Sequence, residues 1–259
     1  MHEEGPATSC LPRITDARIV VTGAVGLIGR KLTYRFAQAG AQVVAVDLDA
    51  ARLRKEFGGV AHILPVPGDV ADEVFADDLF TELASSGGIT ALVNNAALTG
   101  IRIPFLQTTT EMFEAMLATN LRSVYLLSHR AACAWTQTRT PGTIINLSSP
   151  GATRAHPAQS LYDASKGGVE ALSRAMAVEL GPFGIRVNCL APAAVSEVAD
   201  RNATLPLRTS VTPDDIADAA VFLVSPAANH ITGVVLPVDG GLGAQLRVPN
   251  GPSSGQGAA

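Results

Sequence analysis

Short apolar runs alternate with longer amphipathic stretches along most of the chain. The runs hold four to six residues, and the first is Arg18-Ile19-Val20-Val21-Thr22. Their nearly uniform apolar character predicts strands covered on both faces, because a strand with one wet face would alternate apolar and polar residues. The stretches between them have helical spacing and end at glycines, as at Gly40 and Gly58-Gly59.

The pattern predicts strands at residues 18–22, 42–46, 62–66, 90–93, 143–147, 185–189 and 234–238. It predicts helices at residues 27–39, 48–57, 73–86, 110–135 and 160–180. A further helix should begin after the N-cap Thr212, with Pro213 at its first position. Strands that alternate with helices indicate βαβ units. We therefore expect an α/β fold: a doubly wound, mostly parallel, seven-stranded sheet with helices on both faces.

Composition limits the class of protein. The chain has 259 residues, of which 47% are hydrophobic, and a formal net charge of −4. It is too apolar to be disordered, and it has no basic run that would indicate a nucleic-acid partner. The length suits one large domain. We place that domain at 18–245, after an N-terminal extension at 1–17 and before a flexible tail at 246–259 that is poor in apolar residues.

The cysteines and the N-terminus indicate the compartment. The three cysteines form no CxxC, and the five histidines lack metal-ligand spacing, so we expect neither a disulfide framework nor a metal. The first residues lack the basic and apolar regions of a secretory signal. The apolar stretch 219–238 is interrupted by prolines and polar residues, which argues against a membrane span. We expect a cytoplasmic protein.

Three glycines lie between the first strand and the first helix, in Thr22-Gly23-Ala24-Val25-Gly26-Leu27-Ile28-Gly29. Glycines there permit a tight turn that approaches a pyrophosphate, which the helix N-terminus attracts. Asp47 ends the next strand, 18 residues after Gly29. A carboxylate at that place accepts hydrogen bonds from ribose hydroxyls and repels a 2′-phosphate. The pattern predicts a Rossmann-type site for NAD rather than NADP. The alternative is that Asp47 only caps the following helix.

Tyr162 and Lys166 stand four residues apart at a predicted helix start, so they share one face. A phenol has a pKa near 10, which is too high for a base at neutral pH. A nearby cation lowers that pKa, so Tyr162 can exchange a proton with a substrate oxygen. Ser149 ends the preceding strand and can polarise the same oxygen. A Tyr–Lys pair alone is more often a solvated helix face, and the neighbouring serines favour the catalytic interpretation.

Together these residues resemble the short-chain dehydrogenase/reductase family, in its single-domain subgroup of about this length. The resemblance runs from about Arg18 to Gly243. Its motifs are the glycine-rich turn, Gly68-Asp69-Val70, Asn94-Asn95-Ala96-Ala97, Asn120, Ser149, Tyr162-xxx-Lys166, the segment 188–192 and Val238-Asp239-Gly240-Gly241. The set is highly specific, although each motif alone is not.

The resemblance implies roles for the matching positions. Tyr162 would be the general acid/base, with Lys166 lowering its pKa and binding the nicotinamide ribose. Ser149 would hold the substrate oxygen, and Asn120 would position a water in a proton relay. The implied cofactor contacts are Gly23, Val25, Gly26, Leu27, Ile28, Gly29, Asp47, Asp69, Val70, Asn95, Ala96, Ala97, Tyr162, Lys166, Pro192 and Val195. The expected substrate contacts are Ser149, Pro150, His156 and Ala193.

Several positions depart from the family pattern. Leu27, Ala97 and Ala193 stand where glycine is usual. Glu197 stands where a threonine usually bonds the carboxamide, and an ionised carboxylate cannot donate in that way. The lid at 193–212 is short, which predicts a more open site.

We predict an NAD(H)-dependent oxidoreductase that interconverts a secondary alcohol and a ketone on a small molecule. Family members pair through two long helices, so we expect a homodimer or homotetramer, with neither nucleic acid nor membrane as partner. One alternative is an epimerase, dehydratase or lyase that retains NAD, which the glycine spacing favours and the lack of a large C-terminal domain opposes. The other is a non-catalytic dinucleotide sensor, which the presence of Ser149, Tyr162 and Lys166 opposes.

Overall fold

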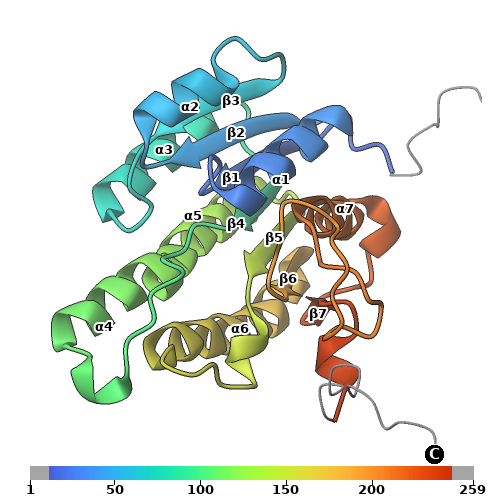
Figure 1. Cartoon of the computed structure of the whole chain (residues 1–259). Coiled ribbons are helices and arrows are strands. Elements are labelled where there is room, and N and C mark those ends of the chain that lie inside the picture. The colour runs from blue at the N-terminus through green and yellow to red at the C-terminus, as the bar shows by residue number, and fades with distance from the viewer. Residues whose placement is uncertain (1–11, 247–259) are drawn as a thin grey trace, which may run out of the picture.

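A parallel sheet forms the centre of the computed structural model, which describes residues 12–246 (Figure 1). Its strands are β1 (Arg18–Thr22), β2 (Gln42–Asp47), β3 (Ile63–Pro67), β4 (Ala91–Asn94), β5 (Gly142–Leu147), β6 (Ile185–Pro192) and β7 (Val235–Val238). Their order is β3-β2-β1-β4-β5-β6-β7, and every neighbouring pair is parallel. The order reverses direction between β1 and β4, the switch point where such sheets bind ligands. The predicted fold class is confirmed.

Helices cover both faces of the sheet (Figure 1). They are α1 (Leu27–Gln38), α2 (Ala50–Phe57), α3 (Glu73–Ser85), α4 (Thr110–Leu117), α5 (Ser123–Thr138), α6 (Ser160–Leu180) and α7 (Pro213–Val224). Neighbouring β1 residues point to opposite faces: Ile19 and Val21 join the core under α1 and α7, whereas Val20 joins the core under α3 and α5. This double burial explains why the strands are apolar throughout.

The helix starts follow local capping chemistry. Thr212 and Asp215 form a capping box at the start of α7, as the sequence predicts for Thr212. Helix α2 begins at Ala50, later than expected, because the Asp49 carboxylate caps it by accepting a hydrogen bond from Arg52 N at 2.9 Å. Asp49, rather than Asp47, is therefore the cap.

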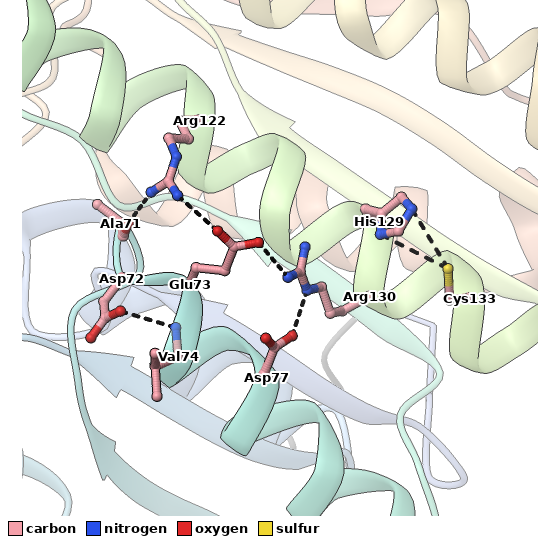
Figure 2. A network of polar contacts seen from close by, with 9 residues as sticks. All are labelled: Ala71, Asp72, Glu73, Val74, Asp77, Arg122, His129, Arg130 and Cys133. Atoms are coloured by element: carbon pink, nitrogen blue, oxygen red, sulfur yellow. Dashed lines mark hydrogen bonds and ion pairs between the residues drawn. The ribbon is translucent and has the colours of Figure 1, made fainter.

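The predicted helix at 110–135 is interrupted. A π-helical turn, Ala118–Arg122, separates α4 from α5 and carries the buried Asn120. Such turns are frequent at functional sites. Figure 2 shows how this region is tied to α3: Arg122 donates to the Ala71 carbonyl and to Glu73, and Arg130 pairs with Glu73 at 3.0 Å and Asp77 at 2.9 Å. Ala71 follows the Asp69-Val70 motif, so the network joins the predicted adenine side to the π turn.

The described end of the predicted N-terminal extension packs on the domain. The Ile14 side chain is buried, and its N–H donates to the Ala39 carbonyl at 3.0 Å. Residues 1–11, which include Cys10, and the predicted tail beyond residue 246 lie outside the described residues. Over residues 12–246, no helix has the length and apolar character needed to cross a bilayer, and no cluster of three potential metal ligands occurs.

Candidate active site

The turn between β1 and α1 is packed around its glycines. Gly23 has φ +63°, and a Cβ atom there would lie 2.8 Å from Ala96 Cα. A Cβ atom on Gly29 would lie 2.0 Å from the Gly23 carbonyl oxygen. In this described segment, the N-cap Gly26 offers no side-chain cap and the first turn of α1 carries no acidic residue. The free N–H groups there suit an anion such as a pyrophosphate.

The other residues of the turn differ in exposure. Val25 is buried, Ile28 is half-buried, and Gly26 and Leu27 are exposed. Leu27, which replaces the glycine usual in the family, starts α1 with 39% of its surface exposed. The larger side chain therefore points away from the packed interior of the turn.

Asn95 and Ala96 support the turn from the end of β4. The Asn95 amide donates to the carbonyls of Thr22 at 2.8 Å and Gly23 at 3.1 Å. The N–H groups of Asn95 and Ala96 both donate to Thr22 Oγ1 at 3.0 Å. The Asn95 side chain therefore holds the predicted cofactor loop in shape, and the half-buried Ala97 follows it.

Asp47 lies against the same turn. Its carboxylate accepts hydrogen bonds from Val25 N at 3.0 Å and Asp49 N at 3.1 Å. Arg52 also reaches the turn and donates to the Val25 carbonyl at 2.9 Å. The sequence analysis did not identify Arg52. Its position in the first turn of the helix that follows Asp47 could have indicated that it lies near the turn. Two opposite charges, Asp47 and Arg52, thus flank the predicted ribose site, where a 2′-phosphate would distinguish NADP from NAD.

On the predicted adenine side, Asp69 and Val70 differ. Val70 is buried, whereas Asp69 is exposed and accepts a hydrogen bond from Ala71 N at 2.9 Å. Taken together, the glycine cradle, the free helix start and the acid at Asp47 fit a nicotinamide dinucleotide.

Tyr162, Ser149 and Lys166 meet beside the carboxyl end of β5. Burial raises the pKa of the Tyr162 phenol, and a hydrogen bond with Ser149 opposes that rise in pKa. Lys166 is 3% exposed, and burial lowers its pKa to about 8. Its ammonium donates to the Leu147 carbonyl at 2.7 Å and lies 5.7 Å from the centre of the Tyr162 ring. Desolvation therefore outweighs the effect of Ser149, and the phenol pKa rises, whereas the sequence predicts that Lys166 lowers it.

Asn120 clamps two segments around Tyr162. Its Oδ1 accepts from Leu98 N at 2.7 Å, and its amide donates to the Leu98 carbonyl at 3.1 Å and to Ser165 Oγ at 3.1 Å. The Ser165 hydroxyl in turn donates to the Tyr162 carbonyl at 2.7 Å. The π turn therefore places an amide that fixes both the loop after β4 and the start of α6.

Three of the expected substrate residues share one cavity. Ser149, Pro150 and His156 line a space of about 710 Å³. The His156 ring is held by Asp163, which accepts from its backbone N–H at 2.7 Å and contacts its Nδ1 at 2.8 Å. Sequence reasoning missed Asp163, although it adjoins Tyr162. Ala193 is instead buried in the apolar core.

The predicted lid, residues 193–212, packs against the domain. Pro192 is buried at the end of β6, and Val195 packs against the core and forms a bridge with Val211. Leu205, within the lid, is also buried in that core. Glu197 is exposed.

Comparison with known proteins identifies the family of this chain. A family model described as enoyl-(acyl carrier protein) reductase matches residues 23–243. L-xylulose reductase of Mesocricetus auratus is 36% identical over 240 residues, which cover 88% of this chain and 97% of that protein. The chain is a short-chain dehydrogenase/reductase. Carbonyl reductase (NADPH) 2 of Sus scrofa is 33% identical over 239 residues, covering 86% of this chain and 95% of that protein.

A solved structure agrees with this family. The crystal structure of 3-ketoacyl-(acyl-carrier-protein) reductase from Brucella melitensis, complexed with NADH, has a TM-score of 0.82 and 33% identity. The match covers 88% of this chain and 98% of that chain. This short-chain dehydrogenase/reductase is an oxidoreductase that acts on a secondary alcohol or its ketone, with a nicotinamide dinucleotide as cofactor. The relatives are reductases by name, which favours this activity over an epimerase, a lyase or a sensor.

Proposed function

We propose that this enzyme interconverts a small secondary alcohol and a ketone with NAD(H), and that Tyr162 is its general acid/base. The Tyr162 phenol, half-buried beside Ser149 and facing the buried Lys166, carries this proposal. A nicotinamide dinucleotide, when bound, supplies or takes up the hydride. The chain itself must bind, orient and exchange the proton.

The two hydroxyl groups define where the substrate oxygen binds. An oxygen between Ser149 and Tyr162 would accept a hydrogen bond from each, which stabilises negative charge on that oxygen. Because burial raises its pKa, the Tyr162 phenol keeps its proton at neutral pH and donates it during ketone reduction. In the reverse direction, the positive charge of Lys166 favours the phenolate. Asn120 acts as a positioning residue that holds the start of α6 against the Leu98 loop.

We propose NAD rather than NADP as the preferred cofactor. Each carboxylate oxygen of Asp47 accepts one backbone N–H, which leaves lone pairs free for ribose hydroxyls. Its negative charge also repels a 2′-phosphate. The positive charge of Arg52 would attract a 2′-phosphate, but this exposed side chain already donates a hydrogen bond to the Val25 carbonyl. The name of the Sus scrofa relative contains NADPH, so the choice needs a direct test.

The activity test uses a panel of ketones and alcohols, with the absorbance of the reduced cofactor as readout. We expect Tyr162→Phe to lower kcat/KM by about 10²–10⁴-fold, the usual contribution of a general acid/base. Tyr125→Phe is the matched control, because Tyr125 is 49% exposed on α5, and it should leave turnover unchanged. Turnover without net change of NADH would contradict the proposal and favour a lyase or epimerase.

We further propose a homodimer or homotetramer that acts in the cytoplasm. Exposed apolar side chains on α4 and α6 support the association: Phe113 is 41% exposed and Val178 is 78% exposed. Light scattering coupled to size-exclusion chromatography measures the oligomeric state. A monomer at the assay concentration would contradict the proposed association. Fractionation of the producing cells tests the compartment.

A further inference from the structure

A small apolar cavity lies next to Tyr162, separate from the larger space lined by Ser149. It has a volume of about 140 Å³. Its walls come from the segment after β4, from α4 and from the start of α6, and they include Leu98, Ile103, Met112, Met116 and Tyr162. Leu98 and Met112 remain 37% and 40% exposed, so the cavity has an open rim through which a ligand can enter.

The walls of this cavity are joined by hydrogen bonds. Ile103 N donates to the Ala158 carbonyl at 2.8 Å, which links the loop after β4 to the segment before α6. Asn120 fixes Leu98 by two further hydrogen bonds. These hydrogen bonds hold the walls of the cavity relative to one another.

The mostly apolar walls offer few hydrogen-bond partners to a ligand. The Thr108 hydroxyl is already used, because it donates to the Phe105 carbonyl at 2.8 Å. Ser160 Oγ is buried and has no partner among the described residues. A polyol would bury several hydroxyls where few partners exist, and each unpaired hydroxyl weakens binding. An apolar cavity of about 150 Å³ is large enough to bind benzene.

We infer that this cavity receives an apolar substituent of the substrate, about the size of a phenyl ring. The substrate class is then an aryl or branched-alkyl ketone, or the matching secondary alcohol, rather than a polyhydroxylated sugar. The inference rests on the proposed function, because it takes Tyr162 as the group that meets the reacting oxygen. It separates this enzyme from L-xylulose reductase, whose name gives a sugar as substrate.

A cavity-filling variant tests the inference. Ala115 lines the cavity from α4, so Ala115→Leu should fill part of it. Ala84→Leu on α3 is the matched control, because Ala84 is exposed and is not among the lining residues. We expect the wild type to prefer acetophenone to L-xylulose in kcat/KM. Ala115→Leu should lower the value for acetophenone by about tenfold or more, the scale of a hydrophobic-pocket change, and leave acetone unaffected.

A binding measurement that needs no turnover tests the cavity assignment separately from the proposed function. Fluorine NMR should detect fluorobenzene bound to the wild type and to Ala84→Leu, and weaker binding to Ala115→Leu. Equal binding to all three proteins, or a preference for L-xylulose, would overturn the cavity assignment even if ketones are reduced. If no ketone is reduced, the proposed function fails, and fluorobenzene binding still decides whether the cavity accepts an apolar group.

Discussion

Two regions of the molecule, the predicted cofactor turn at residues 23–29 and the proposed catalytic region at the start of α6, use different chemical groups. The turn uses backbone groups and glycines. Asn95 donates a hydrogen bond to it and Asp47 accepts one from it, and both side chains are half-exposed. The catalytic region uses side chains, and Tyr162 and Lys166 both have pKa values moved by burial. The turn should therefore be sensitive to added atoms, whereas the catalytic region should be sensitive to changes of charge.

The largest effect on cofactor binding should come from adding one methyl group to the turn. A Cβ atom on Gly29 would lie 2.0 Å from the Gly23 carbonyl oxygen, which is backbone and has little freedom to move. We expect Gly29→Ala to weaken NAD binding at least tenfold and to destabilise the fold by about 1–3 kcal/mol, as overpacking does. Titration calorimetry and urea unfolding measure the two effects.

Gly181→Ala is the matched control for this change. A Cβ atom at Gly181 meets nothing within 4 Å, so this variant should keep wild-type affinity and stability. If Gly29→Ala behaves like Gly181→Ala, the turn is not controlled by steric fit.

The next effect concerns the charge buried at Lys166. Burial lowers its pKa from 10.5 to about 8, so between these pH values the unfolded chain binds more protons than the folded protein. The contribution of Lys166 to the free energy of unfolding then rises with pH over this range, by about 3 to 4 kcal/mol at ~1.4 kcal/mol per pH unit. Lys166→Met removes this contribution. We expect the difference in unfolding free energy between the two proteins to change by this amount from pH 8 to pH 10.5, and parallel stability curves would contradict the prediction.

The smallest effect should be on cofactor choice, because it depends on partly exposed charges at the turn. Asp47→Ala removes the carboxylate that repels a 2′-phosphate, so the ratio of kcat/KM for NADPH over NADH should rise about tenfold. Adding Arg52→Ala should reverse part of that rise, because Arg52 then holds the phosphate. Arg54→Ala, an exposed arginine on the same helix, is the control. A wild type that already prefers NADPH would refute the proposed NAD preference.

Local patterns in the sequence are sufficient to predict much of this protein. Uniformly apolar runs predict the doubly covered strands, since both β1 faces are buried. The Thr212-Pro213 pair predicts the start of α7, and the spacing of Tyr162 and Lys166 predicts that they share one face of α6. Each of these depends on residues within a few positions of one another, where strand alternation and helical periodicity fix which side chains share a face.

Tertiary packing decides the remaining features, because they join residues far apart in the chain. Arg52 reaches the turn at Val25, and Arg122 reaches Ala71, 51 residues earlier. The π turn at Asn120 and the apolar cavity beside Tyr162 likewise depend on how α4, α6 and the Leu98 loop meet. The ammonium of Lys166 donates to Leu147, and its pKa follows from burial. Sequence spacing places this lysine on the right face, but only packing removes water from it.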